Sequence, residues 1–342
     1  MSVFTEFDFE NDVVENQKTK ISSGIFSGGS GTLTSFFTSS TQQATGSFLS
    51  VYHQDPNTGA ATAATAEVQF DIGYAHYAGS GSAGNTTKLT SGGRESIAMH
   101  SQFAQVVLPA QTSRFTMTGA PSGSTDFYFF SFMRSRMREK LDPGNWELRL
   151  GTGATTLKLI DDSGATSNPT VNEGGKVYNV VTGSIATGTA VVKTTAAAET
   201  HGGVGLFYPD LGLIILDATK VSQRCGVVIN RAANAFGANP QKLFAKLVAG
   251  SYFQVRREEE ISSTNYFCRV NNKKYNFSAN PTFATGSTGD FTNATFFKDP
   301  KVFITTVGLY NDDNELLAVA KLSKPVLKSY SREAIIKVKL DF

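Results

Sequence analysis

The chain has 342 residues and a formal net charge of +2, from 31 Lys and Arg residues and 29 Asp and Glu residues. This balance excludes a strong overall field that would attract nucleic acid, and the longest apolar run, residues 211–216, is far shorter than the roughly 20 residues of a membrane span. Charged residues make up 18% of the chain, below the usual quarter, and the small and polar residues that replace them favour many short strands joined by turns.

The first part of the chain, residues 1–154, shows strand patterns separated by wide loops rich in Gly, Ser and Thr. Residues 68–74 alternate strictly and predict a strand with one apolar face. Residues 79–93 predict a long connection, which we expect to become ordered on assembly. Apolar residues at helical spacing predict a helix over residues 95–107, which Pro109 ends.

An aromatic run, residues 126–132, is too dense in Phe and Tyr for a solvent-exposed strand and predicts a strand buried on both faces. It leads into a basic segment, residues 134–140, that contains Arg134, Arg136 and Arg138. Nucleic-acid binding is one interpretation of this segment. We favour partly exposed arginines that pair with acids, including acids of a neighbouring subunit, because arginine is common in ion pairs at interfaces.

Between residues 155 and 220 the sequence changes to short strands and Gly-rich turns, which predicts an inserted β subdomain (residues 155–220). Within it, residues 204–206 and 213–216 predict a hairpin. The fold class that we expect is mainly β with a few short helices, built as β-sandwich-like domains with long Gly/Ser/Thr loops. The parts are either separate domains or one continuous core.

The C-terminal part, residues 221–342, is expected to be α+β and to end in a strand. A helix is predicted over residues 239–248, with Asn239 as its cap and a proline at its first position. Beyond it, residues 264–270 and 274–277 predict two strands joined by an Asn-Asn turn.

The clearest local pattern lies near the end of the chain. Residues 304–310 and 316–322 are apolar and rich in β-branched residues, and residues 311–314 between them are turn formers, which predicts strand, turn and strand. Residues 336–342 alternate as a further strand, and we expect its last residues, up to Phe342, to be paired and buried.

No catalytic, cofactor or metal site is expected. The acid pairs at residues 161–162 and 312–313 lie in predicted turns, where acids normally cap backbone N–H groups rather than cleave sugars. Residues 151–158 contain glycines but lack the Gly-Lys-Ser/Thr ending of a phosphate loop. Cys225 and Cys268 are expected to be buried free thiols. None of the histidines pairs with another at metal-ligand spacing; they are His53, His76, His100 and His201.

The run T-T-V-G-L-Y-N at residues 305–311, followed by E-L-L-A-V at residues 315–319, resembles a segment of structural proteins from contractile-tailed, T4-like bacteriophages, including cyanophages. The resemblance covers residues 256–342. Before that it is weaker and depends mainly on D-P-G-N-W-E-L at residues 142–148. These families have no catalytic residues to carry over.

The resemblance implies a baseplate or tail-associated virion protein that is made in the host cytoplasm. Its partners would be other virion proteins. We expect the chain to act as a homodimer or in symmetric copies, and from its composition and motifs we expect no cofactor, enzymatic activity, bound nucleic acid or membrane span. The alternative within this class is a neck, collar or tail-fibre attachment protein. The alternative of another class is a carbohydrate-binding or carbohydrate-cleaving receptor-binding protein, which would carry surface aromatics beside carboxylates. The candidate assembly or core residues are Gly308, Leu309, Tyr310, Leu316, Leu317, Arg134, Arg136 and Arg138.

Overall fold

The protein is mainly β with a few short helices, as its composition predicts, and it forms two compact units. Unit 1 comprises Met1–Lys20 and Glu260–Phe342, and unit 2 comprises Ile21–Glu259. The chain passes from one unit to the other within two strands, β1 (Val13–Ser27) and β14 (Phe253–Val270). The structure, a computed structural model, describes residues 4–27, 36–38, 48–53, 67–82, 94–110, 112, 114–117, 123–151, 156–164, 170–187, 189–190, 203–232, 238–286 and 288–342.

The predicted boundaries near residues 155 and 220 both fall inside unit 2. Most of the predicted long connection, residues 83–93, lies outside the described residues, as do residues 152–155 of the glycine-containing run. In the described ranges no helix has the length and apolar character needed to cross a membrane.

Unit 2 is built on a large antiparallel sheet. Its strands are β2 (Phe36–Thr38), β3 (Phe48–His53), β4 (Glu67–His76), β5 (Asp126–Phe132), β6 (Lys140–Leu141), β7 (Glu147–Gly151), β8 (Thr156–Asp161), β9 (Thr170–Asn172), β10 (Gly175–Ser184), β11 (Thr189–Ala190), β12 (Gly205–Tyr208) and β13 (Leu213–Asp217). Their order is β14-β7-β8-β10-β12-β13-β5-β4-β3-β2, with β6 paired to β14 and both β9 and β11 paired to β10. The β12–β13 pairing, from Gly205↔Leu216 to Tyr208↔Leu213, confirms the predicted hairpin.

The sheet curls around an apolar core, because strands that are not neighbours in its order share contacts. The Phe253 ring of β14 lies 5.3 Å from the Phe70 ring of β4 and 6.0 Å from the Phe130 ring of β5. Two helices, α4 (Ala218–Cys225) and α5 (Asn239–Gly250), add Val221 and Leu243 to this core. The described part of unit 2 also contains the short helical segments α3 (Arg134–Met137) and η3 (Ile185–Thr187).

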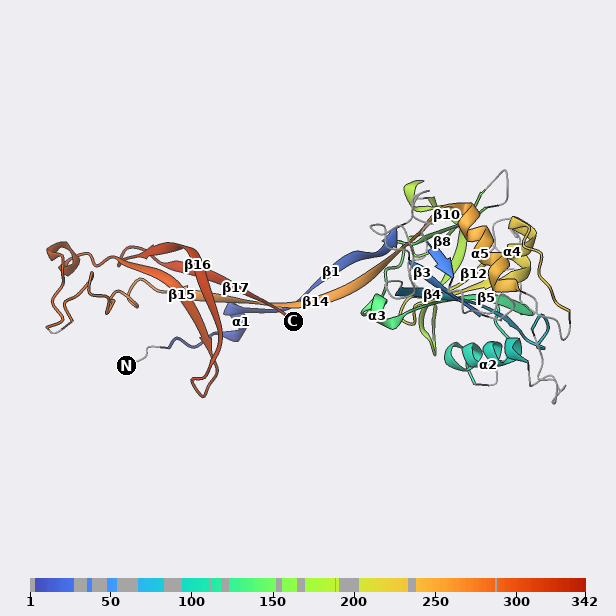
Figure 1. Ribbon diagram of the computed structural model, residues 1–342. Coiled ribbons are helices and arrows are strands. Elements are labelled where there is room, and N and C mark those ends of the chain that lie inside the picture. The colour runs from blue at the N-terminus through green and yellow to red at the C-terminus, as the bar shows by residue number, and fades with distance from the viewer. Residues whose placement is uncertain are drawn as a thin grey trace. The chain divides into compact units, whose positions relative to one another are not determined.

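Strand β5 is buried on both faces, as its aromatic run predicts. Phe130 and its alternate neighbours contribute to the core under α4 and α5. Phe127 and Phe129 face a second core, which is covered by the predicted helix α2 (Glu95–Val107). In Figure 1, α2 lies on one side of β5, and α4 and α5 lie on the other.

Helix α5 begins where it was predicted, but the prediction that Asn239 caps it is wrong. The cap position is Ala238, which has a left-handed backbone, and it provides no side-chain cap. Asn239 instead holds the preceding segment: its Oδ1 accepts from the Asn230 N–H at 2.9 Å, and its Nδ2 donates to the Asn230 carbonyl at 3.0 Å. Two hydrogen bonds to a neighbouring backbone replace the single bond of a cap.

Unit 1 contains the outer part of β14, which pairs with β17 (Ala334–Asp341) from Ser263↔Asp341 to Val270↔Ala334. It also contains α1 (Phe9–Asp12), η4 (Ala294–Phe297) and the two-stranded hairpin of β15 (Val302–Tyr310) and β16 (Leu316–Lys328). This hairpin confirms the predicted strand-turn-strand pattern. The Asn311 N–H donates to the Glu315 carbonyl at 3.0 Å and closes the turn.

Two other predictions for unit 1 are wrong. Residues 274–277 form no strand, because β14 pairs with β17 instead and Tyr275 has a positive φ of 58°. The Phe342 N–H donates to the Ser262 carbonyl at 2.9 Å, so the end of the chain is paired, but the Phe342 side chain is 75% exposed. Pairing of an edge strand does not by itself cover its side chains.

Candidate functional site

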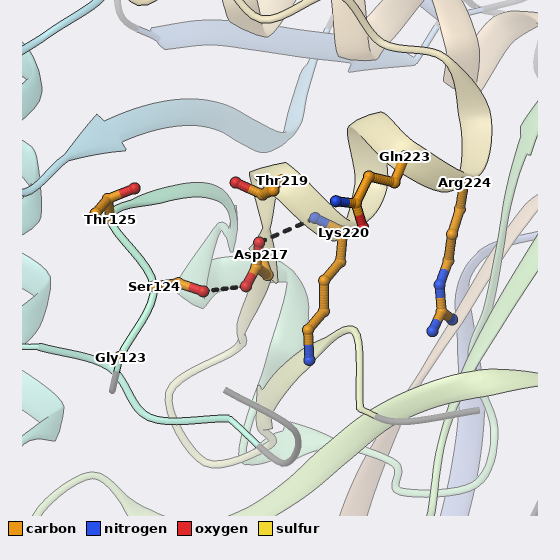
Figure 2. Close-up of a pocket in the computed structure, with 8 residues that line it drawn as sticks. All are labelled: Gly123, Ser124, Thr125, Asp217, Thr219, Lys220, Gln223 and Arg224. Atoms are coloured by element: carbon orange, nitrogen blue, oxygen red, sulfur yellow. Dashed lines mark hydrogen bonds between the residues drawn. The ribbon is translucent and has the colours of Figure 1, made fainter. Parts of the chain in front are cut away.

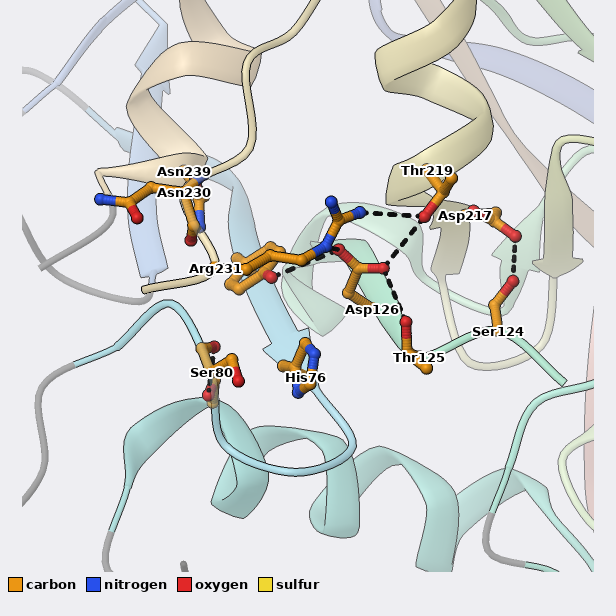
Figure 3. A network of polar contacts seen from close by, with 12 residues as sticks. His76, Ser80, Ser124, Thr125, Asp126, Asp217, Thr219, Asn230, Arg231 and Asn239 are labelled. Atoms are coloured by element: carbon orange, nitrogen blue, oxygen red, sulfur yellow. Dashed lines mark hydrogen bonds and ion pairs between the residues drawn. The ribbon is translucent and has the colours of Figure 1, made fainter. Parts of the chain in front are cut away.

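A buried carboxylate joins four segments of unit 2. Asp126, at the start of β5, is fully buried. It accepts hydrogen bonds from Arg231 Nε at 2.8 Å, from the Thr219 hydroxyl at 3.2 Å and from the Tyr74 hydroxyl at 3.3 Å (Figure 3). The neighbouring Thr125 hydroxyl donates at 3.2 Å, and Arg231 Nη2 also donates to Thr219 at 3.0 Å. A buried charge with this many donors is a structural junction between β4, β5, α4 and the segment before α5.

The surroundings of Asp126 keep the Tyr74 hydroxyl and the His76 imidazole neutral. Burial and the Asp126 charge raise the pKa of the Tyr74 hydroxyl, so this hydroxyl stays a donor. Burial lowers the pKa of His76, which is 9% exposed, and its Nδ1 accepts from the Ala78 N–H at 3.0 Å. The neutral histidine therefore orients a turn and carries no positive charge at neutral pH.

A polar pocket of about 400 Å³ opens beside the N-terminus of α4 (Figure 2). Asp217 caps α4 by accepting from the Lys220 N–H at 3.0 Å, and the Ser124 hydroxyl donates to the other oxygen of Asp217. Lys220 Nζ donates to the Gly203 carbonyl at 2.9 Å. The side chains that line the pocket are Ser124, Thr125, Asp217, Thr219, Lys220, Gln223 and Arg224.

This pocket does not resemble a hydrolytic centre. Ser124 donates its proton directly to a carboxylate that is already committed to capping a helix, and the described lining holds no histidine to act as a base. The Thr125 and Thr219 hydroxyls donate to Asp126. The one acid of the described lining, Asp217, binds Ser124 and the Lys220 N–H. This arrangement is a capped helix N-terminus that is also hydrogen-bonded to the loop before β5.

The basic segment finds its partners within the chain. Arg138 forms an ion pair with Glu259, and Arg134 Nη1 donates to the Asp210 carbonyl at 3.0 Å. The Arg136 carbonyl accepts from Arg257 Nη1 at 3.2 Å. The side chains of Arg134 and Arg138 therefore bind the turn between β12 and β13 and the strand β14, respectively.

The hairpin residues singled out in the sequence lie together, and most of them are exposed. Leu309 is buried at 7% exposure, whereas Tyr310, Leu316 and Leu317 are 44%, 51% and 68% exposed. Gly308 faces Tyr310 and Leu316, since a Cβ at this position would lie 2.9 Å from the Tyr310 ring and 3.2 Å from Leu316 Cδ1. One face of the hairpin therefore packs inwards through Leu309, and the other presents an apolar surface.

Exposed apolar side chains are concentrated in unit 1. Of the large apolar residues that the structure describes as exposed, fifteen belong to unit 1 and seven to the longer unit 2. Buried apolar residues show the opposite distribution, with six in unit 1 and forty in unit 2. The exposed residues of unit 1 are Phe4, Phe9, Val14, Tyr275, Phe277, Phe291, Phe297, Phe303, Tyr310, Leu316, Leu317, Val319, Tyr330, Ile335 and Phe342.

The N-terminal segment is fastened to unit 1 by side chains. The Phe4 ring packs edge-on against Tyr310 at 4.8 Å, and the Thr5 hydroxyl lies 2.7 Å from the Tyr275 hydroxyl. Arg269 Nε of β14 donates to Asp12 at 2.6 Å. This segment therefore extends the apolar surface that begins at Tyr310.

The acids and cysteines that the sequence analysis considered have structural roles where the structure describes them. Asp161 accepts from the Gly144 and Ser163 N–H groups, as predicted for a capping acid, but the prediction that it lies in a solvated turn is wrong, because it is the buried last residue of β8. Cys225 and Cys268 are free thiols, with Cys225 buried and Cys268 half-buried. Burial raises the pKa of Cys225 to about 11, which keeps it protonated.

No cluster of His, Cys, Asp and Glu in the described ranges has the arrangement of a metal site, and His201 lies outside those ranges.

The sequence did not reveal the Asp126 junction. Its one signal is an acid directly before an aromatic strand, which is also the pattern of an ordinary solvated turn. Its partner Arg231 lies 105 residues away, so local patterns could not pair the two.

Comparisons of the chain with protein-family models, with curated proteins and with solved structures give no match.

Proposed function

We propose that this chain is a non-enzymatic structural subunit of a tailed-bacteriophage particle, in the baseplate region of a contractile tail. It acts by packing against other virion proteins through unit 1. The observation that carries the proposal is the apolar surface of unit 1, over the hairpin whose sequence resembles phage structural proteins.

The hairpin needs a partner for physical reasons. A two-stranded sheet is marginally stable in water unless its apolar face is covered. In β16, Leu317 and Val319 are 68% and 59% exposed, and Phe303 of β15 is 59% exposed. Several exposed large apolar side chains on one hairpin are typical of a binding interface. In the proposed function, a neighbouring virion protein buries these side chains in the assembled particle.

The position in the particle is part of the proposal. A baseplate wedge is favoured by the resemblance, and a neck, collar or fibre-attachment role is the alternative. A carbohydrate-binding role would use exposed aromatics beside acids. The exposed aromatics of unit 1 are mainly phenylalanines, which have no polar group for a sugar hydroxyl.

The test is incorporation into particles. Particles are produced in host cells that supply the Leu317→Asp variant as the only copy of the chain, and purified particles are imaged. A buried aspartate at an interface is strongly unfavourable, so the variant is expected to be lost from the particles while remaining folded by circular dichroism. Tyr310→Ala is expected to reduce incorporation more weakly.

The matched control is Val228→Asp, which places the same charge on an exposed apolar residue of unit 2 (76% exposed). This control is expected to be incorporated normally. Normal incorporation of Leu317→Asp, or loss of a hydrolytic activity with assembly intact, would overturn the proposal.

A further inference from the structure

We propose that two copies of this chain associate through unit 1, with an acidic arm of each copy on a basic strip of the other. The acidic arm is residues 4–15, and the basic strip is the exposed Lys and Arg residues of β16, β17 and the turn between them. The inference deepens the proposed assembly role of unit 1 and does not depend on the kind of particle.

The acidic arm carries three glutamates that form no ion pair with the residues that the structure describes. No Lys or Arg precedes Lys18, and the arm contains Glu6, Asp8, Glu10, Asp12 and Glu15. Asp8 caps α1, and Asp12 binds Arg269. The other three, Glu6, Glu10 and Glu15, are exposed, and the described residues offer them no ion pair.

The basic strip is the complement of the arm. Lys321 and Lys324 of β16, Arg332 of the turn and Lys337 of β17 are exposed, and none forms an ion pair within the described ranges. Lys339 is the exception, since it binds Asp341 at 2.8 Å. The strip therefore presents four cations that form no ion pair with any residue that the structure describes.

Apolar side chains accompany both charged surfaces. Phe9 on the arm is 70% exposed, and Leu317 and Ile335 beside the strip are 68% and 65% exposed. An exposed ion pair contributes at most about 1 kcal/mol, so the charges orient the two copies and apolar burial provides most of the affinity.

The geometry favours a second copy over the chain's own strip. The arm is held on β14 by Arg269 and by the Phe7–Tyr266 ring contact at 5.6 Å, and in this position Glu6 and Glu10 are exposed and form no ion pair with the strip among the described residues. Because both surfaces belong to each copy, a two-fold arrangement satisfies two arm–strip contacts at once. Nucleic acid is the competing occupant of the strip, but exposed leucine, valine and isoleucine side chains on the same strands as its lysines favour a protein partner.

The test uses charge reversal in the full chain. The strip variant is Lys321→Glu with Lys337→Glu, and the arm variant is Glu6→Lys with Glu10→Lys. Each alone turns attraction into repulsion and is expected to weaken self-association at least about tenfold in sedimentation equilibrium. An equimolar mixture of the two variants is expected to restore association. In a mixed dimer, the acidic arm of the strip variant meets the basic strip of the arm variant. The basic arm of the arm variant meets the acidic strip of the strip variant.

The control is Lys158→Glu with Lys176→Glu, two exposed lysines of unit 2, and it is expected to leave association unchanged. A wild-type chain that is monomeric at micromolar concentration, or a mixture that fails to restore association, would overturn the inference. So would binding of a DNA duplex by the wild-type strip without self-association. In each of these cases the Leu317→Asp experiment still decides the proposed function independently, since it measures incorporation into particles.

Discussion

At the scale of single residues, burial decides which polar groups carry charge. Lys328 is fully buried, yet its ammonium donates to the Asn272 carbonyl at 3.0 Å, to Asn276 Oδ1 at 2.9 Å and to the Ser329 carbonyl at 3.1 Å. Three acceptors match its three N–H donors, so the charge is compensated. His100 has the opposite environment. It is 2% exposed among aromatic rings, and its Nε2 has no hydrogen-bond partner in the described residues.

His100 predicts a loss of stability in acid. Burial, with smaller contributions from His76 and Arg114, lowers the pKa of His100 from 6.5 to about 4 in the folded state. A histidine whose folded pKa is lowered contributes its full stability above the unfolded pKa of 6.5, and this stability falls as the pH drops towards 4. The expected loss is about 3 kcal/mol in the free energy of unfolding, measured by urea denaturation across this pH range.

The comparison for this prediction is His100→Leu, which keeps an apolar side chain of similar size but cannot titrate. Its stability is expected to fall less between pH 6.5 and pH 4, although His76, with its own lowered pKa, still contributes a smaller fall. Identical pH profiles for the two proteins would contradict the assignment.

Arg231 is expected to stabilise unit 2 through Asp126. Arg231→Ala leaves a fully buried carboxylate with hydroxyl donors alone, and the expected cost is about 2–4 kcal/mol. The readout is urea denaturation followed by the fluorescence of Trp146, which is the chain's one tryptophan and is fully buried in unit 2. Arg138→Ala, which removes the exposed ion pair to Glu259, is expected to cost less than about 1 kcal/mol, and an equal effect of the two substitutions would count against a special role for Asp126.

At the scale of elements, the sequence predicts those strands and helices whose pattern is decided by burial. The doubly buried β5, the helix α2 and the β15–β16 hairpin all follow from apolar spacing and turn residues. Prediction from the sequence fails where the structure of a segment depends on a residue or strand that is distant in the chain. The assignment of Asn239 as a cap is wrong because Asn230 lies beside it, and residues 274–277 are not a strand because β17 pairs with β14 in their place.

Helix α5 approaches β7 so closely that glycine is required at its end. A Cβ on Gly250 would lie 2.1 Å from the Arg149 carbonyl oxygen, and one on Gly151 would lie 2.6 Å from the Ala249 carbonyl carbon. Because backbone atoms cannot move aside as a side chain can, Gly250→Ala is expected to lower the free energy of unfolding by about 1–3 kcal/mol. Gly164→Ala is the matched substitution with open space around it, and it is expected to stay within about 0.5 kcal/mol of the wild type by Trp146 fluorescence.

At the scale of the whole molecule, the two units differ in how they are stabilised. Unit 2 has its own apolar cores on both faces of β5. Unit 1 has few buried apolar residues, among them Phe283, Ile336 and Val338, and many exposed ones. The sequence could not reveal this contrast, because alternation in β16 and β17 shows two faces but does not show which face is covered.

This contrast predicts that unfolding proceeds in two steps. Unit 1 buries little apolar area in a single copy, so it is expected to open at lower urea concentration than unit 2. Association of copies covers its surface and stabilises the folded form by mass action, so the first step should shift to higher urea as protein concentration rises. The second step should not shift. Hydrogen exchange in residues 302–328 reports unit 1, and Trp146 fluorescence reports unit 2.

The strip variant, Lys321→Glu with Lys337→Glu, separates the causes of the first step. It is expected to keep the early opening of unit 1, because the buried residues of that unit are unchanged, but to remove its dependence on protein concentration. A single cooperative transition in which both probes coincide at every protein concentration would show that unit 1 draws its stability from within the chain. The hairpin would then be stable with its apolar side chains exposed to solvent, and this would contradict its proposed role as an assembly interface.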